Sequence, residues 1–178
     1  VDPDRASRFA LRLRIPGWAR GYPVPGDLYR YADPAPAGKV LLRVNGKPSA
    51  LEIDKGYAVL LRDWKPGDIV DLSLPMAPRR VESHPRVEAN RGRIALERGP
   101  VVYCLEGADH GGKVLDILLP RAGRVRAEFR GDLLGGVVVL RGGARRRTGA
   151  RISFTAIPYY AWANRGAGEM AVWLPEAR

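Results

Sequence analysis

Four carboxylates in the second half of the chain are the first candidates for chemistry, because paired acids can act as general acid, general base or nucleophile. They are Glu88, Glu97, Glu106 and Asp109. Glu97 follows the apolar residues of an expected strand and is flanked by Arg93 and Arg98. Ion pairs on a strand surface are common and weak. The pattern therefore favours a surface ion pair over catalysis for Glu97.

Glu106, Asp109 and His110 lie within five residues and could together hold a cation. The same trio is also ordinary for an exposed loop, and we favour that interpretation. His84 is the other histidine of the chain, far away in the sequence. A zinc site needs about four ligands at recognisable spacing. We therefore expect no metal site and assign no catalytic residue to this chain.

Cys104 is the one cysteine, and it lies in the apolar run Val101–Leu105. A disulfide within the chain is impossible, and so is a site with several cysteine ligands. A thiolate nucleophile would need an electropositive and partly open surrounding. We expect instead a buried, protonated thiol that packs as a small apolar side chain.

The chain is strongly basic, with 30 Lys and Arg against 19 Asp and Glu and a net charge of +11. Such a charge suggests an acidic partner, of which nucleic acid is one kind. Most arginines are scattered, and the group that bunches is Arg141, Arg145, Arg146, Arg147 and Arg151, among several glycines. We interpret that group as a solvated turn and expect no nucleic-acid partner.

An aromatic segment near the C-terminus, Tyr159, Tyr160 and Trp162, is the candidate binding site. A second aromatic group near the other end consists of Trp18, Tyr22, Tyr29 and Tyr31. Exposed rings could stack on sugars, which would make the chain a stand-alone carbohydrate-binding module. In a strand, rings at 159–162 would fall on both faces, and such strands usually lie between two layers. We favour contact with a neighbouring domain or between two lobes.

The rest of the pattern predicts an all-β fold. Pro and Gly recur so often that long amphipathic helices have no room, and turn signals at this spacing are typical of antiparallel sandwiches. Residues 9–15 alternate as a half-buried strand, and Asn45-Gly46 predicts a tight hairpin. The other expected strands are 40–44, 51–53, 57–61, 70–74, 94–96, 101–105, 114–119, 125–129, 137–140, 152–156 and 170–174.

Two irregular stretches divide the chain. Residues 20–39 hold Pro23, Pro25, Pro34 and Pro36 and are expected to form a long surface loop. Residues 77–92 are polar, and we place a boundary there between two small sandwich lobes, 1–80 and 81–178. A single larger sandwich is the alternative. The sequence contains no apolar run long enough to span a bilayer and begins without a secretory signal pattern, so it leaves the compartment undetermined.

Several of these stretches together resemble the C-terminal region of the β-L-arabinofuranosidase family of glycoside hydrolases. Residues 92–106, GRIALERGPVVYCLE, are the most specific. The others, in order, are 11–19 (LRLRIPGWA), 44–46 (VNG), 56–58 (GYA), 64–68 (WKPGD) with 74–76 (LPM), and 156–166 (AIPYYAWANRG). Each is weak alone, and their shared order makes the resemblance specific over residues 8–174.

The resemblance implies an N-terminal (α/α)6 barrel that carries catalysis, with a cysteine nucleophile beside a zinc ion held by cysteines and a glutamate. No catalytic position of that family maps onto this sequence, and the nucleophile's role is not transferred to Cys104. We therefore expect a non-catalytic β-sandwich part, inactive alone, that packs on the barrel and supports it. Zinc is expected in the barrel and not in this chain. Glycans of plant type that contain arabinose are the further expected partners.

Overall fold

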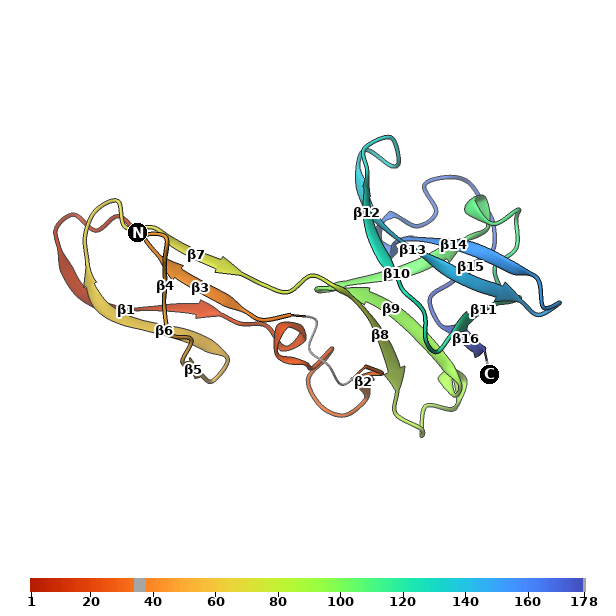
Figure 1. Ribbon diagram of the computed structural model, residues 1–178, viewed down its shortest axis with the longest axis horizontal. Helices are drawn as coiled ribbons and strands as arrows, with labels where there is room; N and C mark the ends of the chain where they lie inside the picture. The colour runs from red at the N-terminus through yellow and green to blue at the C-terminus, as the bar shows by residue number, and fades with distance from the viewer. Residues whose placement is uncertain (34–37, 178) are drawn as a thin grey trace.

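The computed structural model describes residues 1–33 and 38–177, and in this part of the chain every regular element is a strand or a short 3-10 helix. The predicted all-β fold is therefore confirmed. The strands are β1 (Ser7–Arg14), β2 (Tyr29–Tyr31), β3 (Leu41–Val44), β4 (Lys47–Pro48), β5 (Ile53–Asp54), β6 (Tyr57–Trp64), β7 (Val70–Ser73), β8 (Pro78–Ser83), β9 (Arg93–Arg98), β10 (Val101–Glu106), β11 (Ile117–Pro120), β12 (Arg126–Arg130), β13 (Val137–Arg146), β14 (Arg151–Pro158), β15 (Met170–Ala171) and β16 (Leu174–Ala177). The 3-10 helices are η1 (Gly17–Arg20), η2 (Glu88–Asn90), η3 (Gly107–Asp109) and η4 (Tyr159–Ala161). The molecule is elongated: β1 and β3–β7 lie at one end, and β8–β16 lie at the other (Figure 1).

The first end is a small sandwich of two three-stranded sheets, β1-β6-β5 and β4-β3-β7. β1 alternates between half-buried and exposed residues along its whole length, as its sequence predicts. Its apolar face, with Phe9, Leu11 and Leu13, packs on a buried cluster that includes Leu42 and Trp64. The sheets are thus held together by side chains from one face of each.

The turn between β3 and β4 shows why Asn45-Gly46 predicts a hairpin. Both residues have positive φ, 50° for Asn45 and 75° for Gly46, as the two central residues of a type I′ turn require. The Asn45 side chain adds two hydrogen bonds: Oδ1 accepts from the Ile69 amide at 2.8 Å, and Nδ2 donates to the Asp68 carboxylate at 2.8 Å. The hairpin is therefore tied to the loop before β7.

The second end is a larger sheet that closes on itself. The pairings run β10-β14-β13-β11-β16-β9, and β9 also pairs with β10, so that these strands form a closed, barrel-like ring. The pairs are antiparallel except β11–β16, which is parallel. β8 and β2 extend the sheet beyond β9, β12 pairs with β13, and β15 with β10. Closure pairs strand edges that would otherwise be exposed.

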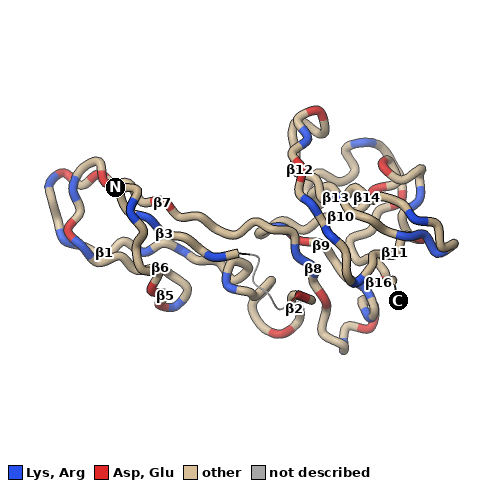
Figure 2. Tube along the Cα trace, viewed as in Figure 1, with Lys and Arg blue, Asp and Glu red and all other residues tan. Residues whose placement is uncertain are grey.

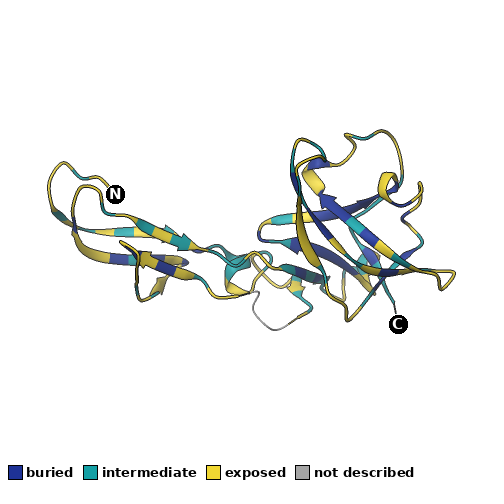
Figure 3. Cartoon of the chain, turned by 45° about the horizontal axis from the view of Figure 1, so that its top comes forward, coloured by how far each residue is buried: buried dark blue, intermediate teal, exposed yellow. Residues whose placement is uncertain are grey.

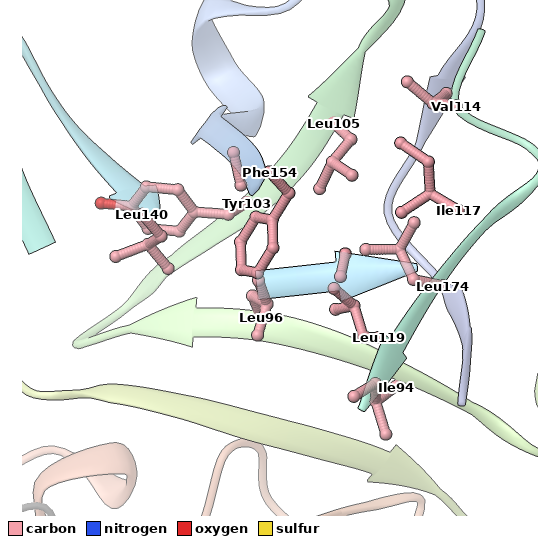
Figure 4. Packing of buried hydrophobic residues seen from close by; sticks show 12 residues of the cluster. Ile94, Leu96, Tyr103, Leu105, Val114, Ile117, Leu119, Leu140, Phe154 and Leu174 are labelled. Carbon is pink, nitrogen blue, oxygen red and sulfur yellow. The ribbon is translucent and has the colours of Figure 1, made fainter. Parts of the chain in front are cut away.

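Side chains from many strands fill the inside of this ring. The buried cluster draws on β9, β10, β11, β13, β14 and β16, and Leu96, Leu105, Leu140, Phe154 and Leu174 point toward one another there (Figure 4). Dark blue, buried positions are correspondingly dense in this end of the molecule (Figure 3). This core holds β14, which leads directly into the aromatic segment, and its paired neighbour β10.

Three sequence interpretations need correction. The expected loop 20–39 contains β2, which pairs with β8, while its residues 34–37 lie outside the described residues. The polar stretch 77–92 begins with β8, a strand that went unrecognised because Arg79 and Arg80 interrupt the apolar alternation. The arginine-rich stretch after Leu140 is not mostly a turn, because β13 continues to Arg146 and pairs with β14.

No helix within the described parts of the chain has the length and apolar character needed to span a bilayer.

Candidate contact surface around the aromatic segment

Tyr159, Tyr160 and Trp162 lie on the surface, directly after β14. Pro158 ends the strand and η4 follows, so the segment is a 3-10 turn and not the two-faced strand that alternation would give. Tyr160 is 71% exposed, Tyr159 45% and Trp162 42%, while Ala161 between them is buried. The tight winding of the 3-10 turn therefore directs the Ala161 side chain inward and the three large rings outward.

Two of these rings form a flat, ordered pair. The ring centroids of Tyr159 and Trp162 are 6.1 Å apart, and the ring planes differ by 7°. This separation lies within the range for offset stacked aromatic pairs. The pair gives the surface a flat apolar patch, which differs from a scatter of single exposed rings.

The residue after Trp162 fixes the direction of the segment. Ala163 has a φ of 66°, in the left-handed region that residues with a Cβ rarely adopt. Its amide donates to Oε1 of Glu106 at 2.9 Å. The Asn164 side-chain amide donates to the carbonyl of Ala161 at 3.1 Å. The first bond holds the end of the aromatic segment against β10, and the second closes the turn on itself.

Glu106 belongs to an ion-pair group with Asp109 and Arg165. The Arg165 guanidinium donates to Oε2 of Glu106 through Nε at 3.0 Å and Nη2 at 2.5 Å. It also donates to both carboxylate oxygens of Asp109, at 2.8 and 2.6 Å. Hydrogen bonding to Asp109, together with that to Glu106, raises the pKa of Arg165, so the guanidinium stays charged. One arginine therefore bridges two acids in a charge-assisted fork.

This group corrects the interpretation of Glu106 and Asp109 as loop decoration. The Glu106 side chain is 7% exposed and that of Asp109 is 20% exposed. The place where a cation could sit between the two acids is filled by Arg165. A recess of about 270 Å³ adjoins the group and is lined by Glu106, Trp162 and Arg165 together with glycine-rich loops. The arrangement anchors the loop that carries the rings and offers no acid–base pair.

His110 lies under the same loop but plays a structural part. Its Nδ1 lies 2.7 Å from the carbonyl oxygen of Glu106, and its Nε2 accepts from the Thr155 amide at 3.2 Å. Because a carbonyl only accepts, we assign the proton to Nδ1 and describe the ring as neutral. Both nitrogens are thus occupied by backbone groups, and His110 joins η3 to β14.

Cys104 is fully buried in β10, as the sequence predicts. Burial, with the charge of nearby Glu106 as a smaller cause, raises the pKa of the thiol to about 12. The thiol is therefore protonated at neutral pH and is not a nucleophile. Among the residues that the structure describes, no group of three or more His, Cys, Asp and Glu side chains could hold a metal ion.

Comparison with known proteins gives the chain a family. Residues 1–76 match the middle domain of the β-L-arabinofuranosidases of glycoside hydrolase family 127, and residues 78–175 match the C-terminal domain of that family. The chain belongs to glycoside hydrolase family 127.

Its relatives within family 127 are much longer proteins. The non-reducing end β-L-arabinofuranosidase of Bifidobacterium longum subsp. longum is 32% identical over 192 residues, which cover 96% of this chain and 26% of that protein. A solved β-arabinofuranosidase of the family is 41% identical with a TM-score of 0.87, covering 97% of this chain and 28% of the other. The β-L-arabinofuranosidase of Geobacillus stearothermophilus T6 is also 41% identical, with a TM-score of 0.85 and coverages of 99% and 28%. The chain thus spans about a quarter of the length of these relatives.

A second polar cluster of this family 127 chain lies where β2 meets β8 and β9 and consists of Tyr31, Arg79 and Glu97. The prediction of a surface ion pair for Glu97 is wrong. Glu97 is 7% exposed, not a surface residue, and its Oε1 accepts from the Tyr31 hydroxyl at 2.8 Å. The Arg79 guanidinium lies 3.7 Å from the Tyr31 ring centroid and donates to the Asp33 carbonyl at 2.7 Å. Burial raises the pKa of Glu97, and the hydrogen bond from Tyr31 opposes that shift.

Of the remaining candidates from the sequence, Glu88 is exposed, whereas His84 is half-buried and lines a recess together with Tyr31 and Arg79. Glu88 is in η2 and pairs with Arg91 at 3.5 Å. The His84 Nδ1 accepts from the Arg86 amide at 3.1 Å. Sequence reasoning missed Arg165 and Arg79, which organise the two buried clusters. Arg165 lies three residues after Trp162, so its place beside the aromatic segment is the signal in the sequence that points to it.

Proposed function

We propose that this chain is the non-catalytic β part of a family 127 β-L-arabinofuranosidase and that it packs on and supports a catalytic (α/α)6 barrel. The observation that carries the proposal is the aromatic segment: Tyr159, Tyr160 and Trp162 are exposed, yet the loop that bears them is rigidly anchored. Tyr and Trp are enriched in protein interfaces, where their large apolar faces are buried on association. A surface that is ordered in advance also loses less entropy on docking.

The lengths of the relatives support the same proposal. Each match covers nearly all of this chain but only 26–28% of the relative named above. In the relatives, this region therefore lies beside a much larger remainder. We assign the catalysis, with its expected cysteine nucleophile and zinc ion, to that remainder, as the family resemblance implies.

Binding of the chain to a barrel tests the contact directly. A family 127 enzyme shortened to its barrel is titrated with the 178-residue chain in a calorimeter. Wild-type chain is expected to bind, and the double variant Tyr160→Ala/Trp162→Ala is expected to bind at least about tenfold more weakly, as for truncation of interface anchors. Phe129→Ala is the matched control, because Phe129 is a ring 70% exposed on β12 that does not belong to the segment. Equal loss with both variants would refute the assigned surface.

Turnover tests the non-catalytic role separately. The isolated chain is expected to release no nitrophenol from nitrophenyl β-L-arabinofuranoside above background, while a full-length family enzyme does so in the same assay. Turnover by the purified chain that persists in the Tyr160→Ala/Trp162→Ala variant would contradict the assignment.

A stand-alone carbohydrate-binding module is the second candidate, and the near-parallel Tyr159–Trp162 pair favours it. A flat aromatic platform of this kind can stack on a sugar ring. Titration with arabinan or arabinogalactan oligosaccharides distinguishes the two, because stacking on Trp162 would change tryptophan fluorescence. Saturable quenching that Trp162→Ala abolishes would favour the module over the barrel contact.

We further propose that the chain folds as two domains, with the division predicted at residues 1–80 and 81–178 moved to just before β8, because a division after residue 80 would cut that strand. The buried cluster around Trp64 and the buried cluster around Leu105 share no residue, which supports a division between them. Family matches that end at residue 76 and begin at residue 78 support it as well. β2 crosses the division, because it precedes β8 in the sequence and pairs with that strand.

A further inference from the structure

The outer face of β12, β13 and β14 carries an arrangement of arginines that the fold does not need. Arg126 on β12 lies directly opposite Arg141 on β13, and Arg145 on β13 lies directly opposite Arg151 on β14. Like charges in directly opposed positions destabilise a sheet. Figure 2 shows Lys and Arg along these strands and near the β13–β14 turn. We call this surface, with neighbouring Arg124, the arginine face.

Few acids neutralise the arginine face. Arg141 lies 3.3 Å from the Glu128 carboxylate, and both side chains remain nearly half exposed. Within the described residues, no carboxylate comes within 4.0 Å of Arg124, Arg126, Arg145 or Arg151. By contrast, Arg146, the neighbour on the opposite side of β13, is paired with Asp116 at 2.6 Å. The unpaired cations therefore gather on one side of the sheet.

Small residues form a floor between the two arginine pairs. Gly143 lies directly opposite Ser153, and both are exposed on the same face as Arg141 and Arg145. A Cβ added at Gly143 would meet no atom within 4 Å. A trough of about 380 Å³ results, lined by Arg124, Arg126, Arg141, Gly143 and Ser153 together with Glu128 and Gly142. Positions 141 and 145 are about 14 Å apart along the strand, so the two pairs suit an extended ligand with repeated charges.

We propose that the arginine face binds an acidic polysaccharide, a glycan chain whose sugars bear carboxylates. A guanidinium presents two parallel N–H donors that match the two oxygens of a carboxylate. The small-residue floor leaves room for sugar rings to lie flat between the pairs. The residues that line the trough include no aromatic ring, whereas sites for single-stranded nucleic acid use aromatic platforms for the bases. The choice of a glycan rests on the proposed function, since the chain belongs to a family of glycoside hydrolases.

The test is a binding titration of the 178-residue chain with polygalacturonate, neutral arabinan and a DNA duplex of matched charge. The wild-type chain is expected to bind polygalacturonate, with an affinity that falls as salt rises, and to bind arabinan and DNA at least about tenfold more weakly. The double variant Arg126→Gln/Arg151→Gln is expected to weaken polygalacturonate binding about tenfold or more, because each of its two substitutions removes a charged hydrogen-bond donor. Gly143→Leu fills the trough without changing the charge and is expected to weaken binding similarly.

The matched control is Arg5→Gln/Arg8→Gln, which removes the same charge from exposed positions at the other end of the molecule. Equal loss in the control and the Arg126→Gln/Arg151→Gln variant would show attraction by net charge alone and overturn the proposal. Absence of binding, or tighter binding to DNA, would overturn it too. Arg126→Gln/Arg151→Gln leaves the aromatic segment intact, so barrel binding by this variant keeps a failure here distinct from a failure of the proposed function.

Discussion

Glu97 and Glu106 are two buried glutamates for which the structure predicts opposite responses to the same substitution. Glu97 accepts a hydrogen bond from the neutral Tyr31 hydroxyl, and the Arg79 guanidinium lies over the Tyr31 ring. Glu106 is bonded directly to the Arg165 guanidinium and to the Ala163 amide. Replacement of each by glutamine removes the charge and keeps the shape. Glu97→Gln and Glu106→Gln therefore compare a buried carboxyl that makes no ion pair with any described residue, although Arg79 lies opposite it on β8, with a buried carboxylate bonded directly to a guanidinium.

For Glu97 the direction follows from its raised pKa. The native state binds the Glu97 proton more tightly than the unfolded chain does, because burial disfavours the carboxylate. Its contribution to stability is therefore complete below the unfolded pKa, about 4.5, and is lost as pH rises through the folded pKa. At pH 7, Glu97→Gln is expected to be as stable as wild type or more stable, and the gain should shrink toward zero as pH falls below 4.5.

For Glu106 the magnitude follows from its partners. The variant loses the charged Oε2, which accepts from both Nε and Nη2 of Arg165, while Arg165 keeps Asp109 and the Ala163 amide keeps an acceptor. Hydrogen bonds to charged groups contribute about 1.5–3 kcal/mol, so the expected loss is about 2–3 kcal/mol at pH 7. For a chain of this size that corresponds to a fall in Tm of roughly 4–12 °C.

Urea denaturation of both variants and wild type, followed by circular dichroism between pH 4 and pH 8, gives the free energies of unfolding. If Glu97→Gln destabilises the chain at pH 7 as much as Glu106→Gln does, with an unchanged pH dependence, the roles assigned to the two carboxyl groups are wrong.

Three further outcomes follow from packing. Cys104 should not react with a thiol reagent at pH 8 in the native chain but should react fully in urea; fast native labelling would contradict its burial. In thermal melts, Gly142→Ala should cost about 1–3 kcal/mol, because its Cβ would lie 2.8 Å from the Phe154 ring and 3.0 Å from a backbone oxygen. Gly143→Ala should be close to neutral, because a Cβ there would meet no atom within 4 Å. Equal effects of the two variants would contradict the assigned faces of β13. Trp64→Ala should cost about 3–5 kcal/mol. On heating this variant, the NMR amide signals of the first lobe should disappear at a lower temperature than those of the second lobe. Simultaneous loss of both sets of signals would argue against separate cores.

Much of the fold could be predicted because local patterns and the tertiary structure agree. The alternation of Phe9, Leu11 and Leu13 places β1 correctly, since one face of that strand packs on the Trp64 cluster. Asn45-Gly46 specifies its turn through backbone geometry alone. In these regions, the residues adjacent in sequence carry the information that decides the structure.

Other elements could not be predicted because the residues that stabilise them lie far away in the chain. β8 contains buried Arg79, and burial of that guanidinium depends on the Tyr31 ring, 48 positions earlier. The role of Glu106 depends on Arg165, 59 positions later. A prediction from neighbouring residues places a polar side chain on the surface. Buried polar clusters whose members lie far apart in the sequence are therefore missed. The aromatic segment was found by composition, but its outward display required the 3-10 turn of η4.

Hydroxyl-radical footprinting reports the solvent exposure of individual rings and therefore tests whether the aromatic segment contacts the barrel. The measurement compares Tyr159, Tyr160 and Trp162 in the 178-residue chain alone and in the presence of a saturating family 127 barrel. We expect strong modification of all three rings in the free chain and marked protection with the barrel, while Phe129 is modified equally in both samples. Unchanged modification of the three rings in a sample where the barrel is shown to be bound would contradict the claim that this segment forms the contact.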